Sequence, residues 1–281
     1  MKKHILFAMM LAMSLSAVAQ QKISIFCDHI ETIAQQEKIS FQEAAQKIKD
    51  MGYTGADVGV TLDAQKLQVL EQLGFQHSCA IVHVDYYKGE QKEQEELALK
   101  FLQQNGYDRL LLVPGLRPAT PGKNIDEKVF ARLKTFTTKL KNMGFEVMVE
   151  DFDNPASPCF DTASLDKLFA ATPVTTHVFD TGNYLFCGDD VMTALSHFRE
   201  RIKHVHLKDR LAKGSMQSPA IGTGIVPMQQ VITSLLSTGY DGWLCVEHYG
   251  SRHMLQDAEL SIRFVKTAVE SMNFPKQEAM A

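Results

Sequence analysis

The sequence predicts a single-domain α/β protein, a parallel (β/α)8 barrel of the TIM type. Three observations lead to this fold class. Short apolar strands alternate with helical segments along the chain, which favours a parallel sheet joined by helical crossovers. The strands are apolar at nearly every position, as strands covered on both faces require. Eight such units fit into about 260 residues, a length typical of a parallel sheet that closes into a barrel.

The expected strands are short β-rich runs bounded by glycine, proline or polar residues. In chain order they are Ile23–Phe26, Ala56–Val60, Gln76–His83, Arg109–Val113, Phe145–Glu150, His177–Asp180, Arg201–Leu207 and Gly242–Glu247. The expected helices carry apolar residues at helical spacing, and several stop at a glycine such as Gly52 or Gly74. They are Ser40–Met51, Asp63–Leu73, Glu90–Gln104, Asp126–Met143, Ser164–Ala171, Asp189–Arg199, Met228–Ser237 and Leu255–Met272.

The first nineteen residues predict a secretory signal peptide rather than part of the fold. Lys2 and Lys3 precede an apolar run, 5–17, and Ala17-Val18-Ala19 has the small-residue pattern of a cleavage site. The run is too short for a permanent membrane anchor. We therefore expect an exported barrel domain, residues 20–281, that is periplasmic or secreted and has no membrane anchor after cleavage.

Charge and cysteine content narrow the class of protein further. Without Lys2 and Lys3, 27 basic residues face 33 acidic ones, a formal charge of −6. With no basic stripe in the sequence, we expect no nucleic-acid partner. The five cysteines show no metal-ligand spacing. Cys159 and Cys187 fall in loops expected on one face of the barrel, and the sequence leaves open whether they pair in an oxidising compartment. It also leaves a homo-oligomer open.

Acidic and imidazole side chains mark the ends of four successive strands. They are Glu150, Asp180, His206 and Glu247, at intervals of 30, 26 and 41 residues. The ends of neighbouring parallel strands meet at one mouth of a barrel. A carboxylate that faced the dry helix layer would be costly, whereas one that faces the mouth is stabilised by a cation. Each residue alone is more often structural, but the four together predict a divalent metal site.

The chain resembles the xylose-isomerase-like TIM barrel family, in particular sugar isomerases and epimerases related to tagatose 3-epimerase. The matching segments are Val147-Met-Val-Glu150-Asp-Phe, Phe179-Asp180-Thr-Gly-Asn183, His204-Val-His206-Leu-Lys208-Asp209-Arg210, Gly222-Thr-Gly224, Gly239-Tyr-Asp-Gly-Trp243 and Val246-Glu247. The resemblance implies one Mn, Co, Mg or Zn ion, with Glu150, Asp180, His206 and Glu247 as its ligands. It also implies a small-molecule sugar substrate.

The resemblance implies proton transfer next to a sugar carbonyl. Glu150 and Glu247 would flank the reacting carbon, one taking the proton and the other returning it through an enediolate. Lys208 shares a strand face with His206, and is expected either to polarise a substrate oxygen or to pair with Asp209.

Four further residues are expected to bind substrate at the mouth: Arg210, His83, His29 and Asn183. Asn183 stands where several relatives carry a histidine, so the contact at that position stays open. His204 is expected to pack or to support the site. Gly222-Thr-Gly224 reads as a turn rather than a phosphate cradle, and an exported protein meets few sugar phosphates. We therefore expect a free sugar or a glycoside.

Three other functions compete with the epimerase. A metal-dependent lyase or dehydratase acting on a keto-sugar or a 3-keto-glycoside would use the same glutamate pair. A sugar-binding protein without turnover is a more distant alternative, because an acidic metal site would serve it poorly. An abasic-site endonuclease on this barrel needs extra histidines, which the loop Ser215–Gly222 does not supply.

Overall fold

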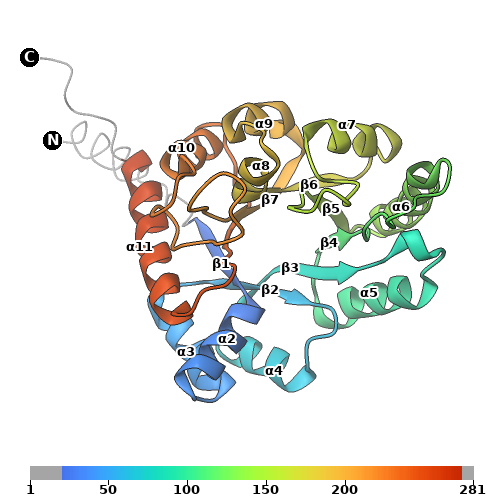
Figure 1. Ribbon diagram of the computed structural model, residues 1–281. Helices are drawn as coiled ribbons and strands as arrows, with labels where there is room; N and C mark the ends of the chain where they lie inside the picture. Colours follow the sequence, from blue (N-terminus) through green and yellow to red (C-terminus); the bar gives the residue numbers. More distant parts are fainter. Residues whose placement is uncertain (1–20, 274–281) are drawn as a thin grey trace, which may run out of the picture.

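The computed structural model describes residues 21–273, and these form the predicted closed barrel of eight parallel strands (Figure 1). Each strand pairs with the next along the chain, and the first pairs with the last. The strands are β1 (Lys22–Phe26), β2 (Gly55–Gly59), β3 (Gln76–His83), β4 (Arg109–Val113), β5 (Glu146–Glu150), β6 (Thr176–Asp180), β7 (Ile202–Leu207) and β8 (Trp243–Val246). The predicted signal peptide lies outside the described residues.

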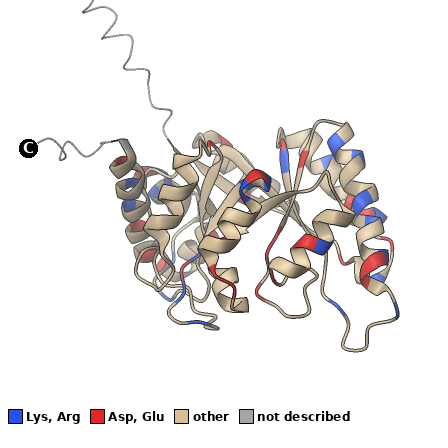
Figure 2. Ribbon diagram, turned by 90° about the horizontal axis from the view of Figure 1, so that it is seen from above, with Lys and Arg blue, Asp and Glu red and all other residues tan. Residues whose placement is uncertain are grey.

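Helices surround the barrel as an outer ring (Figure 1). They are α2 (Cys27–Glu37), α3 (Phe41–Met51), α4 (Ala64–Gln72), α5 (Lys92–Asn105), α6 (Ile125–Asn142), α7 (Thr162–Ala171), α8 (Thr181–Cys187), α9 (Val191–Phe198), α10 (Met228–Ser237) and α11 (Met254–Asn273), with short 3-10 turns η1 (Tyr86–Lys88) and η2 (Arg199–Arg201). Basic and acidic residues are interspersed over these helices (Figure 2). Within residues 21–273, none of the helices combines the length and the apolarity that a membrane span needs.

Local capping explains why the helices start and stop where they do. Ser40 and Glu43 form a capping box at the start of α3, in which each residue bonds the backbone N–H of the other. The same helix ends at Gly52, whose φ of 101° is readily adopted only by glycine. Two helices, α2 and α8, escaped prediction because each begins directly at the end of a strand, with no loop to mark the change.

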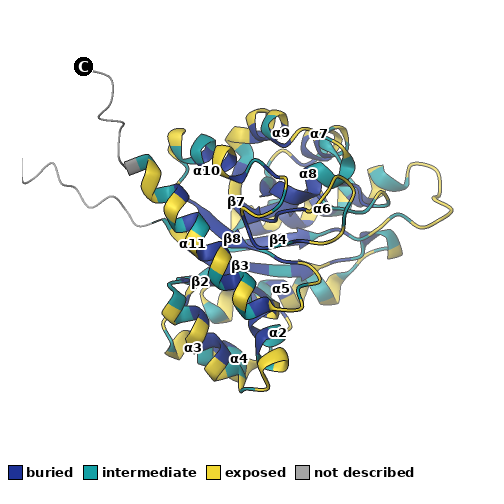
Figure 3. Ribbon diagram, turned by 60° about the vertical axis from the view of Figure 1, so that its left-hand side comes forward, coloured by how far each residue is buried: buried dark blue, intermediate teal, exposed yellow. Residues whose placement is uncertain are grey.

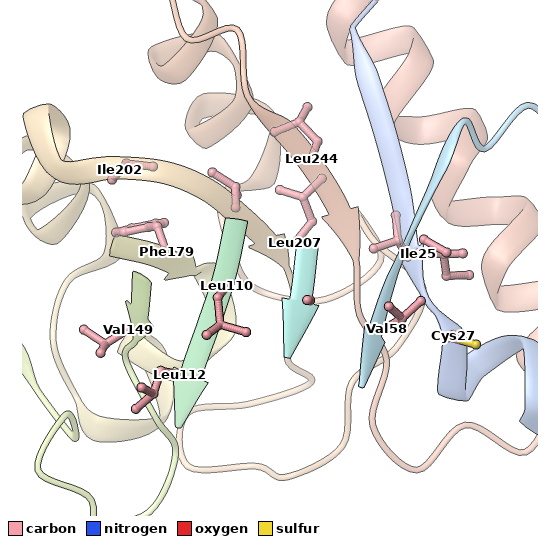
Figure 4. Close-up of a cluster of buried hydrophobic side chains, with 14 of the residues drawn as sticks. Ile25, Cys27, Val58, Leu110, Leu112, Val149, Phe179, Ile202, Leu207 and Leu244 are labelled. Carbon is pink, nitrogen blue, oxygen red and sulfur yellow. The ribbon is translucent and has the colours of Figure 1, made fainter. Parts of the chain in front are cut away.

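Side-chain alternation divides the strands into an outer apolar face and an interior face. Outward residues such as Val58, Leu112, Val149 and Leu244 belong to the large cluster between barrel and helices (Figure 4). Burial is greatest along the strands, while the helices expose their outer sides (Figure 3). The interior holds a small separate apolar cluster, made of Cys79, Leu111, Met148 and Val178.

The strand register sets the level of the interior side chains near the mouth. Glu150 is level with Val178, and Asp180 is level with His206. His206 is in turn level with Cys245, two residues before Glu247. Along the register Asp180 and His206 are therefore level, Glu150 lies two residues lower and Glu247 two residues higher, a stagger that follows from the tilt of the strands in a closed barrel.

All five cysteines fall within the described residues and are free thiols. Cys159 and Cys187, which the sequence left as a candidate pair, are not bonded to each other in this structure.

Candidate metal centre and active site

The four strand-end side chains converge at the C-terminal mouth of the barrel. Each of Glu150, Asp180, His206 and Glu247 offers one ligand atom, and these atoms all lie within 4.8 Å of one another. Asp180 and His206 are fully buried, whereas the side chain of Glu247 keeps 15% of its surface exposed. We call these four residues the mouth cluster.

The local fold fixes the orientation of the Asp180 carboxylate. Asp180 ends β6 and caps α8, so its Oδ1 accepts the backbone N–H groups of Gly182 and Asn183 at 2.8 and 2.9 Å. Its Oδ2 is buried and accepts no well-aligned hydrogen bond; it is compensated by an ion pair with the Lys208 ammonium, 2.7 Å away. A buried carboxylate oxygen that lacks an aligned hydrogen bond leaves a coordination direction free. A cation would fill that direction, so the cluster fits a metal ion on this observation.

The donor set of the mouth cluster fits the same conclusion. Three carboxylates and one imidazole suit Mg, Mn, Co or Zn, the ions that oxygen and nitrogen ligands select. Glu150, Asp180, His206 and Glu247 would hold the ion.

Lys208 supplies a positive charge inside the cluster. Its Nζ lies 2.6 Å from Glu247 Oε1 as well as close to Asp180, and it donates to Asn183 Oδ1 at 3.3 Å. Burial alone would lower the pKa of Lys208, but the ion pairs with Asp180 and Glu247 outweigh burial and raise it. Lys208 therefore stays charged. The pairing with Asp209 that the sequence allowed does not form.

The titration of His206 and Glu247 reflects their crowding. Burial raises the pKa of the Glu247 carboxyl to about 8, and the nearby Asp180 and Glu150 carboxylates add to the effect. Burial opposes the charge on His206, but Glu150 and Asp57 beside its ring raise its pKa well above the ordinary value. The cluster without a cation therefore retains protons on these side chains, which a metal ion must replace.

A pocket of about 350 Å³ opens directly over the mouth cluster. This volume lies at the lower end of the range for small-molecule sites. Its polar lining includes Glu150, Glu247 and Lys208. Its apolar lining consists of Phe26, Ile81, Leu111, Val113 and Phe152, with Met216 and the exposed Tyr249 also contributing. The arrangement offers polar groups for hydroxyls and an apolar side for C–H groups.

The four expected substrate residues divide into two pairs. His83 and Asn183 line the pocket. The side chain of Asn183 is already hydrogen-bonded: its Nδ2 donates to Asp151 O, and its Oδ1 accepts from Lys208 and Arg210. His29 and Arg210 are buried and do not line this pocket. His29 stacks between Phe26 and His248 and accepts the His248 backbone N–H through Nε2.

Arg210 ties the loops of the mouth together instead of facing the pocket. Its guanidinium has five N–H donors, and five contacts occupy them. The acceptors are Gly182 O at 3.3 Å, Ser215 O at 3.2 Å, Met216 O at 3.0 Å, Asp153 Oδ2 at 2.6 Å and Asn183 Oδ1 at 2.9 Å. Direct contact with substrate, expected from the sequence, would require Arg210 to give up one of these bonds.

The Gly222–Gly224 turn wraps around Asp209. The Asp209 carboxylate accepts the backbone N–H groups of Arg210, Gly222, Gly224 and Val226. A Cβ on Gly224 would lie only 2.3 Å from Asp209 Oδ1, so glycine is required there. The amides of Gly222 and Gly224 are thus occupied by the chain's own carboxylate, which agrees with a simple turn.

One residue of the site, Asp57, was missed by the sequence reasoning. It lies on the interior face of β2, fully buried beneath the mouth cluster, with its Oδ2 3.3 Å from His206 Nε2. The available signal was an aspartate inside the apolar strand Ala56-Asp57-Val58, where a charge needs partners.

Known proteins resemble this chain in sequence and in fold. The family model described as xylose isomerase-like TIM barrel matches residues 45–268. An inosose dehydratase from Lacticaseibacillus casei is 26% identical over 135 residues, which cover 41% of this chain and 45% of that protein. The match thus spans less than half the length of that curated relative.

Two solved structures share the fold over most of the chain. A probable 3-DHS dehydratase from Bacillus anthracis has a TM-score of 0.71 at 14% identity, covering 87% of this chain and 98% of that chain. A D-tagatose 3-epimerase-like protein has a TM-score of 0.71 at 17% identity, covering 90% of this chain and 98% of that chain. At these identities the likeness concerns the fold.

Proposed function

Because the chain belongs to the xylose isomerase-like TIM barrel family, we propose that it is a divalent-metal-dependent sugar isomerase or epimerase. It would remove the proton from the carbon next to a sugar carbonyl, form an enediolate, and return a proton to give the product. The observation that carries this proposal is the mouth cluster, which lies at the floor of a sugar-sized pocket and presents two glutamates to it.

The two glutamates supply the acid–base pair of the proposed reaction. The chemistry that a bound divalent cation would supply is polarisation of the carbonyl and stabilisation of charge on the enediolate oxygens. Glu150 and Glu247 both line the pocket, so one can take the carbon-bound proton and the other return it. Lys208 holds Glu247 in place through a 2.6 Å ion pair and adds a fixed positive charge near the substrate oxygens.

A second candidate is a metal-dependent dehydratase or lyase. The curated relative from Lacticaseibacillus casei is named an inosose dehydratase, and a structural neighbour is named a probable 3-DHS dehydratase. Elimination begins with the same proton abstraction, after which the group β to the carbonyl leaves with a proton from an acid. A cyclic ketone or a 3-keto-glycoside would be the substrate class. A sugar-binding protein without turnover would show neither reaction.

One experiment separates these outcomes. The purified protein, loaded with Mn²⁺, is incubated in deuterated water with ketohexoses, inososes and 3-keto-glucosides, and the products are followed by NMR. Exchange of the carbon-bound hydrogen with an epimeric product supports the first candidate, whereas loss of water or of the glycosidic group supports the second. Tight binding of a sugar without any exchange would identify a binding protein and refute both.

Matched variants connect the reaction to the residues. We expect Glu150→Gln and Glu247→Gln to lower the exchange rate by about 10²-fold or more. Glu146→Gln is the control, because Glu146 lies at the opposite end of β5 and bonds Lys141 and Thr176. Full activity in both pocket variants would rule out the proposed roles.

We further propose that the mature protein is exported and acts on a free sugar or glycoside. The charge and apolar pattern of residues 1–19 supports export, and the occupied amides of the Gly222–Gly224 turn argue against a phosphate subsite there. Sequencing of the N-terminus after expression in a bacterial host, together with fractionation of its cells, tests this. Retention of residues 1–19 in the cytoplasmic fraction would contradict export.

A further inference from the structure

The barrel interior beneath the mouth contains a second, fully enclosed polar group. Its centre is Asp57, whose side chain is fully buried. Oδ1 accepts hydrogen bonds from Ser24 Oγ at 3.0 Å and Ser78 Oγ at 2.6 Å. Oδ2 lies 2.7 Å from His204 Nε2 and 3.3 Å from His206 Nε2. The carboxylate thus has four partners, drawn from β1, β3 and β7.

This carboxylate dictates which nitrogens of the two histidines carry protons. An ionised carboxylate only accepts hydrogen bonds, and a neutral imidazole has one N–H and one lone pair. Contact with Asp57 Oδ2 therefore requires the proton of His206 on Nε2. Nδ1 then faces the mouth, where Glu150 Oε1 contacts it and Glu247 Oε2 lies 3.4 Å away. Without a cation this contact with Glu150 holds a second proton on Nδ1, and a metal ion at the mouth would replace that proton and meet the Nδ1 lone pair.

We propose that Asp57 is the positioning residue of the metal centre, which fixes His206 in the Nε2–H tautomer so that Nδ1 binds the cation. This inference rests on the proposed function in one respect: both require that the mouth cluster binds a cation. Metal-bound histidines generally donate their other N–H to a carboxylate or carbonyl, and this outer partner orients the ring and increases its basicity. Here the outer partner is Asp57 on β2, which precedes His204 and His206 by 147 and 149 residues.

His204 completes the arrangement from the layer below. Its ring stands perpendicular to that of His206, with centroids 5.2 Å apart, and its 2.7 Å bond is the shorter of the two histidine contacts to Oδ2. The His204 bond and the two serine hydroxyls hold the Asp57 carboxylate on both oxygens. The carboxylate can then orient His206 without rotating.

The same atoms could instead hold a second metal ion. One ligand atom from each of Asp57, His204, His206 and Cys245 lies within 4.8 Å of the others. The contacts favour hydrogen bonding, because both serine donors and both imidazoles already fill the carboxylate acceptor sites. A metal ion here would also need both Nε2 protons removed. Metal stoichiometry decides between these arrangements.

The test measures Co²⁺ binding by calorimetry and by the visible spectrum of the bound ion. Asp57→Asn keeps the shape but removes the charge that faces His206. We expect its Co²⁺ affinity to fall about 10- to 100-fold, the range found when such outer partners are changed, with a shifted visible spectrum. Ser78→Ala is the matched control, because it removes a bond to the same carboxylate without touching a histidine. Its affinity should stay within about threefold of the wild type.

Several outcomes would overturn the proposal. Unchanged Co²⁺ affinity and spectrum in Asp57→Asn would remove the positioning role while leaving the metal centre intact. Two ions per wild-type chain, reduced to one by Cys245→Ser, would show that the inner group is itself a metal site. Absence of Co²⁺ binding by the wild type would refute the metal-dependent function as well, so failure of the two proposals can be told apart.

A measurement on the wild-type protein tests the proposal even if Asp57→Asn does not fold. In the Zn²⁺-loaded protein labelled with ¹⁵N-histidine, long-range ¹H–¹⁵N spectra report which ring nitrogen carries the proton. We expect the Nε2–H form for His206, assigned by the loss of its signals in His206→Gln. A proton on Nδ1 would contradict the proposal directly.

Discussion

Replacing Arg210 tests whether this residue stabilises the mouth or binds substrate. In Arg210→Met, the side chain keeps an unbranched stem but loses the guanidinium and all five donors. Three backbone carbonyls, the Asn183 carbonyl and the Asp153 carboxylate lose a partner together. We expect lower stability, because each of these groups was desolvated for a bond that no longer forms.

The magnitude follows from the burial of the ion pair. Removing one partner of a buried salt bridge costs about 3–5 kcal/mol. The Asp153 side chain keeps 17% of its surface exposed, so water can partly replace the guanidinium, and we take about 3 kcal/mol as the expected loss. In a domain of this size each kcal/mol lowers the melting temperature by about 2–4 °C. The expected shift is therefore about 6–12 °C.

Thermal and urea unfolding followed by circular dichroism measure this change. Arg263→Met is the control, because its side chain is 71% exposed and pairs only with Glu259 on the same helix, and it should alter stability by less than about 0.5 kcal/mol. An unchanged melting temperature in Arg210→Met, combined with a raised KM, would refute the structural role. It would restore the substrate contact that the sequence suggested.

Three further predictions concern the turn, a helix cap and the cation. Gly224→Ala should destabilise the protein by about 1–3 kcal/mol in urea unfolding, because its Cβ would overlap Asp209, whereas Gly122→Ala, with open space around it, should be neutral. Asp190→Ala should cost about 1 kcal/mol at pH 7 through loss of the α9 cap. Hydrogen bonds to the Thr193 N–H and hydroxyl lower the Asp190 pKa, so this stability is present above the unfolded-state pKa near 4 and is lost as pH falls. The difference from wild type should therefore shrink at pH 3, and a constant difference would contradict the assignment. Mn²⁺ at about 100 times its Kd should stabilise the protein by about 2.7 kcal/mol, seen as a higher melting temperature that Asp180→Asn abolishes.

The fold was predictable because the sequence patterns that indicate each strand and helix lie within that element. The short apolar run Leu110–Val113, preceded by Arg109 and stopped by Pro114, favours a strand buried on both faces, and the structure has a strand over Arg109–Val113. The helix Met228–Ser237 likewise has the predicted bounds. The barrel and the family resemblance are confirmed. Convergence of the four strand ends was also foreseeable, because strand ends of a closed parallel sheet have only one mouth to meet at.

Side-chain partnerships across the barrel could not be predicted in the same way. Arg210 looks like an exposed loop cation in the sequence, yet it is completely buried, with acceptors from its own loop, from the loop after β5 and from helix α8. Asp57 has its histidine partners 147 and 149 residues further along the chain. Such contacts depend on the strand register and on rotamers, and neither leaves a periodic trace in the sequence.

Apolar and polar side chains lie side by side in the barrel interior. Cys79 of the small apolar cluster is level with Asp57, and Val178 is level with His204, while the mouth cluster gathers three carboxylates at the strand ends. An apolar filling of these polar positions would be simpler to stabilise, because every buried polar atom needs a partner. Buried atoms left without a hydrogen bond include Asp180 Oδ2, Asp151 Oδ2 and His204 Nδ1, all in or next to the residues that make up the two polar groups. Sequences depart from the most stable filling mainly where a site requires it. The cost is confined to the barrel interior, while the apolar layer between the barrel and its helices maintains the fold around the site.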